Sequence, residues 1–396
     1  MHALNIRDDV ATRIRAGVPV VEIGSVDGAT GQQAGRPVRL LDRKSELVGC
    51  GLLDPENDVV RILSWTAVKS FDAAFFRARV RDAVALRRAL GLVKPGESYR
   101  AIHGDGDGLS GFAADVYGDY AVLYAYSAAL VGLGREIARA LQEELKLRGV
   151  VVKVRPRGGA KPGQVKQETV GEEPPEKLVV QELGVPYEVH LLGGLNVGLF
   201  TDMREHRRNM ARLVTGKRVL NTFAYTGALS VTAARLGATS VTSVDLASGV
   251  NKWAMENFRL SGLNPDEERW RFETSDVMRF MQKEVDRGAQ YDVIIMDPPT
   301  VSGVSARSWS MRSDYPDLIA LAVKLLPVES GGVLWVSANQ HKGPGVMKYI
   351  EDGMKSAKRL AQVLEVGGLP PDHPTPVAWP EGRYLEVCYL RVPPEQ

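Results

Sequence analysis

The chain has 396 residues, 44% of them hydrophobic and 25% charged, which are the proportions of a soluble globular protein of two or three domains. It contains no apolar run of about 20 residues such as a membrane span needs, and we expect no signal peptide, because its start lacks a basic segment followed by an apolar one. The net charge of +2 neither requires nor excludes RNA, and the two distant cysteines predict no disulfide framework or metal site and suit the cytoplasm.

The first 190 residues predict two small domains. Residues 1–70 contain short apolar segments separated by turn residues, a pattern typical of a small β-barrel. Residues 71–190 mix helical and strand patterns and predict an α+β domain. We expect strands at 20–24, 37–41, 59–63, 112–116, 120–124 and 150–155, and helices at 71–90 and 133–147.

Two basic clusters allow two interpretations each, an RNA contact or an ordinary solvated surface. The first lies in a Gly/Pro-rich stretch without an acidic residue, and the second has nearly helical spacing. The members are Lys153, Arg155, Arg157, Lys161 and Lys166 in the first cluster, and Arg204, Arg207, Arg208 and Arg212 in the second.

Residues 191–396 alternate between strand and helix, as in a doubly wound parallel sheet. The alternation predicts a Rossmann-like α/β domain whose ligand lies at the carboxyl ends of the strands. We expect strands at 218–221, 240–245, 270–273, 291–296, 332–336 and 384–392, and helices at 204–214, 228–236, 250–261, 277–287, 317–326 and 346–360.

The turns after these strands indicate the cofactor. The strand ending at Asn221 runs into a small-residue turn that has no G-x-G-x-x-G sequence for a pyrophosphate. An adenosine without phosphate, S-adenosylmethionine, is therefore expected, with its carboxylate at the helix start near Thr226 and Gly227. Asp245 ends the next strand and is placed to accept both ribose hydroxyls. Asp276 follows the third strand and could accept from the adenine amino group or cap a helix.

The sequence Asp297-Pro298-Pro299-Thr300 follows the fourth strand and predicts the substrate side of the site. Each proline removes an N–H and biases the preceding residue toward extended geometry, so the loop should be stiff. Such a rim can stack a planar group and hold a nitrogen in line with a methyl carbon. An ordinary proline-rich turn is the alternative.

These segments resemble the multidomain class I methyltransferases of 23S rRNA, in which a PUA-type RNA-binding barrel and an α+β domain precede a Rossmann-like catalytic domain. The resemblance runs from end to end of the chain. It implies that Asp202 and Arg204 help to close the cofactor pocket. The matching segments are 71–76 (FDAAFF), 106–111 (GDGLSG), 198–204 (GLFTDMR), 221–227 (NTFAYTG), 297–299 (DPP), 372–374 (DHP) and 380–385 (PEGRYL).

The chain departs from the members of this family that methylate cytosine C5. Those members carry a cysteine nucleophile after the fifth strand, because C5 reacts only after a thiolate adds to the ring. Residues 336–342 (VSANQHK) contain no cysteine, and Cys388 is expected to be a core residue and Cys50 to lie in the barrel. This region, with Val244-Asp245-Leu246, resembles the guanine-N7 methyltransferases of 23S rRNA. Asn339 would position a base edge or cap a turn.

The sequence therefore predicts a cytoplasmic, S-adenosylmethionine-dependent methyltransferase acting on guanine N7 of 23S rRNA, without a metal. Open alternatives are a cytosine-C5 methyltransferase, an enzyme for a small molecule or protein amide, and an inactive RNA-binding protein. RNA is the expected partner, a homodimer stays open, and Trp309 and Trp379 are candidate stacking residues. Expected catalytic residues are Asp297, Pro298, Pro299 and Asn339, and expected cofactor-binding residues are Arg204, Asn221, Phe223, Tyr225, Thr226, Gly227, Asp245, Leu246, Asp276 and Asp297.

Overall fold

The computed structural model describes residues 1–156, 165–299, 301–302, 309–340 and 343–395. These residues form two compact units. Unit 1 comprises Met1–Glu182, Val189–Val197 and Pro370–Gly382, and unit 2 comprises Leu183–Glu188, Gly198–Leu369 and Arg383–Gln396. The predicted boundary at residue 70 lies within unit 1, and the boundaries at 70 and 190 stay predictions. A stretch between two strands of unit 2, Pro370–Gly382, thus folds into unit 1.

Unit 1 begins with a five-stranded sheet in the order β1-β3-β4-β5-β2 around a core of its own. The three predicted strands of this region are confirmed, while β1, β4 and α1 were not predicted. Glycines hid β4, and one of them is required by strand pairing, because a Cβ on Gly51 would lie 2.1 Å from the carbonyl oxygen of Arg61. The elements are β1 (His2–Asn5), α1 (Asp8–Arg15), β2 (Val20–Glu22), β3 (Pro37–Leu41), β4 (Leu47–Asp54) and β5 (Val59–Ser64), with the 3-10 helix η1 (Ile23–Ser25).

The second part of unit 1 is a sheet in the order β10-β9-β8-β7-β6 against which α2 and α3 pack. Asp72 starts α2 by accepting a hydrogen bond from the backbone N of Phe75 at 3.0 Å. β11 and β12 form a two-stranded sheet, and the segment Leu183–Glu188, which includes most of β12, is part of unit 2. The elements are α2 (Ala73–Ala89), β6 (Ser98–His103), η2 (Gly104–Asp107), β7 (Phe112–Tyr117), β8 (Tyr120–Ala125), η3 (Ala128–Leu130), α3 (Val131–Leu145), β9 (Gly149–Val154), β10 (Gln167–Gly171), β11 (Leu178–Glu182) and β12 (Val185–Val189).

Unit 2 is built on a seven-stranded sheet in the order β15-β14-β13-β16-β19-β21-β20. The strands from β15 to β19 run parallel, and β21 is inserted antiparallel between β19 and β20. The strand order reverses beside β13, which is where such sheets bind their ligands. The strands are β13 (Arg218–Thr222), β14 (Ser240–Asp245), β15 (Trp270–Thr274), β16 (Val293–Met296), β19 (Gly332–Asn339), β20 (Gln362–Gly367) and β21 (Leu385–Val392).

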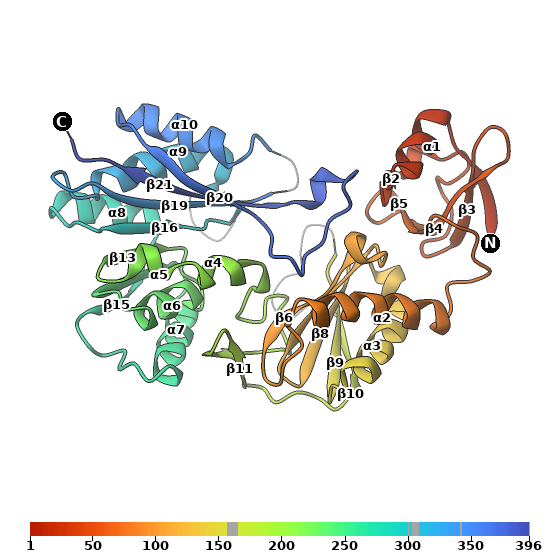
Figure 1. Cartoon of the computed structure of the whole chain (residues 1–396), viewed down its shortest axis with the longest axis horizontal. Coiled ribbons are helices and arrows are strands. Elements are labelled where there is room, and N and C mark those ends of the chain that lie inside the picture. Colours follow the sequence, from red (N-terminus) through yellow and green to blue (C-terminus); the bar gives the residue numbers. More distant parts are fainter. Residues whose placement is uncertain (157–164, 300, 303–308, 341–342, 396) are drawn as a thin grey trace. The chain divides into compact units, whose positions relative to one another are not determined.

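Helices cover both faces of this sheet, with α6 and α7 on one face and α8, α9 and α10 on the other (Figure 1). The predicted helix at 204–214 is in fact two short helices, and α9 begins before Pro316 because Met311 and Tyr315 are buried in the core. The remaining elements are η4 (Thr201–Met203), α4 (Arg204–Arg208), α5 (Ala211–Val214), α6 (Ala228–Arg235), α7 (Ser248–Leu260), α8 (Val277–Asp286), β17 (Val301–Ser302), β18 (Trp309–Ser310), α9 (Met311–Lys324), α10 (Val346–Ala357) and η5 (Pro380–Gly382).

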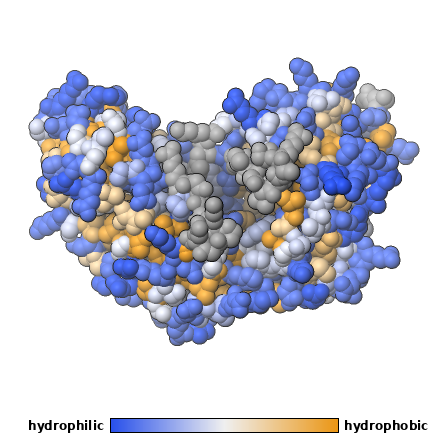
Figure 2. All heavy atoms as spheres, turned by 180° about the vertical axis from the view of Figure 1, so that it is seen from behind, coloured by the Kyte–Doolittle hydropathy of each residue, from blue (hydrophilic) through white to orange (hydrophobic). Residues whose placement is uncertain are grey.

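The surface agrees with the composition. Figure 2 shows one face of the molecule, on which hydrophilic residues predominate and apolar residues form small groups. Among the described residues, no helix combines the length and the apolar character that crossing a membrane requires.

Candidate active site

The turn between β13 and α6 (residues 223–227) has an unusual backbone. Phe223 and Tyr225 adopt positive φ angles of 55° and 49°, a conformation that L-residues rarely hold without support. The support comes from β14, because the backbone N of Ala224 donates to the carbonyl of Val244 at 2.9 Å. Gly227 has φ 72°, and a Cβ there would lie 2.8 Å from the Cβ of Ala254 on α7. The glycine therefore permits both the turn and the close approach of α7.

Asp245, at the end of β14, connects this turn with the next one. Its Oδ2 accepts a hydrogen bond from the backbone N of Tyr225 at 2.9 Å, and its Oδ1 accepts one from Ala247 at 3.1 Å. A carboxylate has about four acceptor positions, so each oxygen can accept one further donor. Asp245 fixes the turn and is still able to accept two ribose hydroxyls.

Two of the predicted cofactor residues support the turn from within the protein. The side chains of Asn221 and Thr226 are buried, and Asn221 donates to the Ser230 hydroxyl at 2.9 Å. The Thr226 hydroxyl donates to the carbonyl of Gly198, and its own carbonyl accepts from Asn257 at 2.8 Å. These two side chains therefore hold the turn from inside the protein, and the buried Oδ1 of Asn221 has no hydrogen-bond partner among the described residues.

The segment before α4 lies against the same turn. The rings of Phe200 and Tyr225 lie 5.5 Å apart, and Phe200 remains 44% exposed. Arg207 is buried and donates to the carbonyl of Phe200 at 2.6 Å. Arg204 is also buried, 3.3 Å from Glu205. The predicted contact of Arg204 with the cofactor stays a prediction.

Two further predicted cofactor residues follow neighbouring strands. Leu246 is 42% exposed directly after Asp245, so an apolar side chain lies beside the proposed ribose acceptor. Asp276 is exposed and caps α8, accepting from the backbone N of Arg279 at 3.0 Å. The capping role is thus observed, and an adenine contact stays a prediction.

The Asp-Pro-Pro loop (residues 297–299) is held by partners that are distant in sequence. The Tyr315 hydroxyl donates to the carbonyls of Met296 at 3.0 Å and Ser337 at 2.7 Å. The Trp309 indole donates to the carbonyl of Pro299 at 2.8 Å. Pro298 is buried and Pro299 is exposed, while Thr300 lies outside the described residues. The loop is therefore fixed at both of its ends.

Asp297 has an altered acidity in this loop. Burial raises its pKa to about 6, the Ser337 hydroxyl that donates to it at 2.5 Å lowers it, Asp202 raises it and Arg207 lowers it. Asp202 itself accepts a hydrogen bond from the Tyr384 hydroxyl at 3.1 Å. The structure thus gathers residues of three sequence segments around one carboxyl group that titrates near neutral pH.

Each of the two candidate stacking tryptophans packs against other residues of its own unit. Trp309 is 9% exposed, and its ring centroid lies 5.1 Å from that of Phe223, so both residues brace the Asp-Pro-Pro loop. Trp379 belongs to unit 1 and packs against the barrel core. Asn339 is the exposed last residue of β19, paired with Leu385 of β21. Its role toward a base stays a prediction.

The two cysteines are poor nucleophiles. Cys388 is fully buried in β21 opposite Val336, with its Sγ 3.9 Å from the Sδ of Met347. Burial raises the pKa of the Cys388 thiol to about 11. Cys50 is buried in β4 of the barrel. A thiolate attack on a base would therefore require these side chains to leave their cores.

Several described members of the two basic clusters are buried or paired with acidic residues. Lys153 is buried, its Nζ donates to the carbonyl of Gly194, and burial lowers its pKa to about 8. Arg157 and Lys161 lie outside the described residues. In the second cluster two members are buried, and two are exposed and paired with acids. The buried members are Arg204 and Arg207, and the pairs are Arg208 with Glu205 and Arg212 with Glu365.

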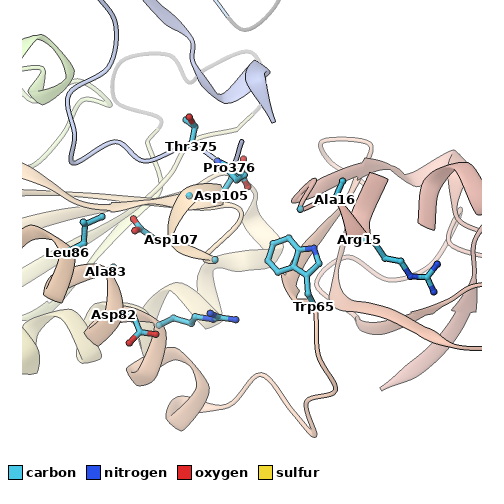
Figure 3. A pocket seen from close by; sticks show the side chains of 14 residues that line it. Arg15, Ala16, Trp65, Asp82, Ala83, Leu86, Asp105, Asp107, Thr375 and Pro376 are labelled. Atoms are coloured by element: carbon cyan, nitrogen blue, oxygen red, sulfur yellow. The ribbon is translucent and has the colours of Figure 1, made fainter. Parts of the chain in front are cut away.

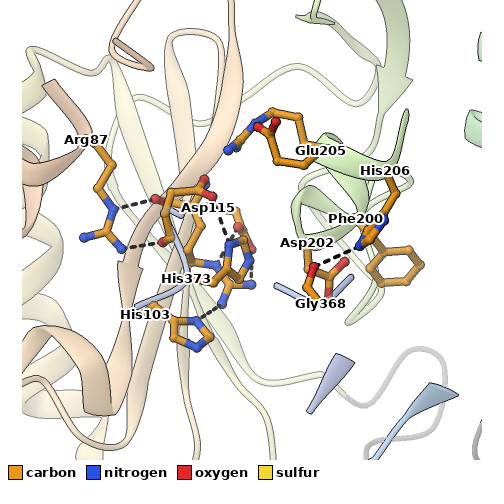
Figure 4. A network of polar contacts seen from close by, with 12 residues as sticks. Arg87, His103, Asp115, Phe200, Asp202, Glu205, His206, Gly368 and His373 are labelled. Atoms are coloured by element: carbon orange, nitrogen blue, oxygen red, sulfur yellow. Dashed lines mark hydrogen bonds and ion pairs between the residues drawn. The ribbon is translucent and has the colours of Figure 1, made fainter. Parts of the chain in front are cut away.

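The segment 372–374 is structural within unit 1 (Figure 4). Arg87 forms two hydrogen bonds with Asp107, at 2.7 and 2.8 Å, and a third with the carbonyl of Asp372 at 2.6 Å. The Asp372 carboxylate accepts from the backbone N of Arg100 at 2.9 Å. In unit 2, His206 bonds to the carbonyl of Gly368 at 2.8 Å, at the end of the strand that precedes this segment. Hydrogen bonds thus hold Asp372, within the stretch Pro370–Gly382, and Gly368, just before it.

Sequence comparisons relate the chain to known methyltransferases. A family model for S-adenosylmethionine-dependent methyltransferases matches residues 148–378, and a PUA-like domain model matches residues 4–65. The ribosomal RNA large subunit methyltransferase I of Photobacterium profundum is 32% identical over 369 residues, covering 90% of this chain and 91% of that protein. The enzyme of the same name from Klebsiella pneumoniae is 32% identical over 371 residues, covering 91% of this chain and 90% of its own.

Solved structures agree over the whole chain. A protein assigned as a methyltransferase and crystallised with SAH has a TM-score of 0.89 and 26% identity, and the match covers 99% of this chain and 100% of that one. A protein from Streptococcus mutans, assigned as a SAM-dependent methyltransferase, has a TM-score of 0.87 and 26% identity with the same coverage. The predicted fold class, a PUA-like barrel with a Rossmann-like domain, is confirmed.

Several residues of the site escaped the sequence analysis. Ser337 and Tyr315 hold the Asp-Pro-Pro loop, and Arg207 adjusts the charge on Asp297. Ser337 stands in a segment that we noted for its lack of cysteine, and this could have suggested a role. Tyr315 offers no such signal, since a tyrosine before a proline carries no motif.

Proposed function

The chain belongs to the S-adenosylmethionine-dependent methyltransferases, and from this we propose that it methylates a base of large-subunit ribosomal RNA at a ring nitrogen, guanine N7. The cofactor is S-adenosylmethionine, and the protein is an enzyme. The names of the relatives support the RNA substrate. We propose further that the enzyme works in the cytoplasm, where its two buried free thiols would stay reduced.

The observation that supports a nitrogen acceptor is the state of the cysteines. Cytosine C5 becomes nucleophilic only after a thiolate adds to the ring, whereas N7 of guanine has an in-plane lone pair. Cys388 is buried with a raised pKa, and Cys50 lies in the barrel. Direct transfer of the methyl group needs neither thiol.

The donors at the ends of β13 and β14 suit the cofactor. The Asp245 carboxylate has free acceptor positions for ribose hydroxyls, and the exposed Leu246 can cover the adenine ring. The backbone around Gly227 begins α6 and can receive the amino-acid carboxylate. When bound, the cofactor supplies a methyl group activated by a positively charged sulfur.

Asp297 has a defined task in this scheme. Methylation at N7 moves one positive charge from the sulfur to the purine, and no proton has to leave. An ionised Asp297 beside the ring would stabilise that developing charge, and the stiff Asp-Pro-Pro loop would hold the base plane. Asn339, at the end of the neighbouring strand, would bind a base edge.

The test is to identify the product. Ribosomal RNA from a strain that lacks the protein is incubated with the enzyme and methyl-labelled cofactor, digested to nucleosides and analysed by mass spectrometry. The label is expected in 7-methylguanosine. Label in 5-methylcytidine, or a covalent complex with RNA containing 5-fluorocytidine, would overturn the proposal. An absence of label from RNA altogether would favour a non-RNA substrate or an inactive protein.

A further inference from the structure

Unit 1 contains a cavity of about 610 Å³ to which none of the active-site residues contributes (Figure 3). Its walls come from the barrel, from α2, from η2 and from the stretch Pro370–Gly382 between β20 and β21. This volume lies within the range of roughly 300–1,000 Å³ that is usual for ligand sites. Its aromatic residue is Trp65, and its charged lining residues are Arg15, Arg79, Asp82, Asp105 and Asp107, of which Asp107 is paired with the buried Arg87.

Trp65 gives the cavity an aromatic surface. Its indole N–H already donates to the carbonyl of Ile14 at 2.7 Å, so the ring has no polar group left for a ligand. The ring packs against the barrel core and also lines the cavity. In Figure 3 it projects into the space between the barrel and α2. What it offers to a ligand is an apolar surface held in a fixed orientation, which suits a planar ring.

Arg79 is the cation beside this ring. Its guanidinium is held 5.3 Å above the Phe75 ring and donates to the carbonyl of Leu63 at 3.1 Å, so it is fixed while several of its N–H groups stay available. Arg15 on the barrel side is instead paired with Asp42 at 2.6 Å. A phosphate group would therefore find its cation on the wall formed by α2.

The single acid of α2 also lines the cavity. Asp82 lies three residues after Arg79, on the same face of the helix, and it is exposed. A carboxylate accepts hydrogen bonds from the N–H groups on the edge of a nucleobase. An aromatic surface for the ring, a cation for the phosphate and an acceptor for the base edge are three elements of single-stranded RNA recognition.

We propose that this cavity binds one unpaired nucleotide of the RNA substrate, with its base on Trp65, its phosphate near Arg79 and its edge at Asp82. The inference rests on the proposed function, because RNA is its ligand. It adds an anchoring site in unit 1 that is separate from the methylated base. The cavity would act in binding and not in the methyl-transfer step.

The test uses the full-length protein and a fluorescein-labelled single-stranded RNA of about 15 nucleotides taken from the ribosomal substrate, followed by fluorescence anisotropy. Trp65→Leu is expected to weaken binding roughly tenfold, and Trp65→Phe to retain most of the affinity, since it keeps a ring. Arg79→Gln should weaken binding several-fold. Arg81→Gln removes the same charge from an exposed position of α2 outside the cavity and should change binding less than about twofold.

Two controls separate the outcomes. Calorimetry with SAH should give wild-type affinity for all four variants, because the cofactor residues lie in unit 2. Thermal unfolding identifies a variant that has lost its fold, in which case the pair Arg79→Gln and Arg81→Gln decides. Equal losses in this pair, or wild-type RNA binding by Trp65→Leu, would overturn the cavity even if wild-type enzyme methylates RNA. Trp65-dependent RNA binding without methyl transfer would retain the cavity and defeat the proposed function instead.

Discussion

The β13–α6 turn and the Asp-Pro-Pro loop lie on the same sheet but are stabilised in different ways. The turn is fixed by hydrogen bonds to the end of the adjacent strand, at Val244 and Asp245. The loop is fixed by side chains that follow it by 10 to 40 residues, namely Trp309, Tyr315 and Ser337. The conformation of the turn thus depends on backbone hydrogen bonds, and a short sequence motif is enough to predict its function. The loop obtains its chemistry, an acid that titrates near pH 6, from the surrounding tertiary structure.

The largest effect is expected from Asp245→Ala. This change removes the proposed ribose acceptor together with the hydrogen bond to Tyr225, so the affinity for SAH should fall about 100-fold or more, as calorimetry would measure. Asp276→Ala is the comparison, since Asp276 follows the next strand, caps α8 and is expected to contact adenine. It should cost about 1 kcal/mol of stability through the lost cap, and less affinity for SAH than Asp245→Ala. Equal losses of affinity in both variants would contradict the larger role given to Asp245.

A change of Asp297 to Asn should distinguish the role of the loop in methyl transfer from the role of the turn in cofactor binding. We expect roughly a tenfold or larger loss of methyl transfer at saturating cofactor, because the proposed charge stabilisation is lost. The loss of affinity for SAH should be much smaller than in Asp245→Ala, because the other proposed cofactor residues are retained. In the wild type the rate should rise with pH through about 6 and then level off, since the carboxylate is the active form. The variant should have no such rise. The raised pKa of about 6 places the expected rise between pH 5 and 7. A wild-type profile that is flat over this range would contradict the role of Asp297.

The same variant has a stability effect of known sign. The pKa of Asp297 is raised in the fold, so the folded state favours the protonated form and its stability falls as the pH rises from the unfolded pKa through about 6. Asp297→Asn removes that charge, and it should therefore be more stable than the wild type at pH 8 and not at pH 4. Melting temperatures at these two values of pH measure the difference.

Gly227→Ala tests whether the turn requires a residue without a side chain at this position. A Cβ at φ 72° and 2.8 Å from the Cβ of Ala254 should lower the free energy of unfolding by about 1–3 kcal/mol. Gly249→Ala is the control, because Gly249 lies in α7 with open space around its Cα, and the change should be neutral or slightly stabilising. Denaturant titration measures both. An unaffected Gly227→Ala protein would mean that α7 can shift away from the turn.

The contrast between turn and loop also explains what the sequence could predict. The strand from 240 to 245 was predicted with its observed bounds, and a last strand was expected at 384–392, because apolar periodicity and motif spacing are local signals. The antiparallel direction of that last strand was not predicted. The features that the sequence did not predict depend on which side chains are buried in the tertiary structure. Lys153 lies in a strand that was predicted, but it is buried and so belongs neither to an RNA contact nor to a solvated surface. Helix α9 begins at Met311, before its proline, because Met311 and Tyr315 are buried. The edge strand β20 was missed, since its apolar side chains remain exposed and show no alternation.

The smallest effect, and the most specific, is expected from Ser337→Ala. The Ser337 hydroxyl lowers the pKa of Asp297 by donating to it, so its removal should raise that pKa further and move the rise in the pH–rate profile upward by less than about one unit. At pH 8 the rate should remain close to that of the wild type, because Asp297 is still ionised there. Ser330→Ala, on the surface after α9, removes a hydroxyl without touching the loop. A profile that moves downward, or that moves equally in both variants, would mean that Ser337 does not set the acidity of Asp297. The charge state of Asp297 would then be set by burial and by the charges of Asp202 and Arg207, and not by the strand that carries Ser337.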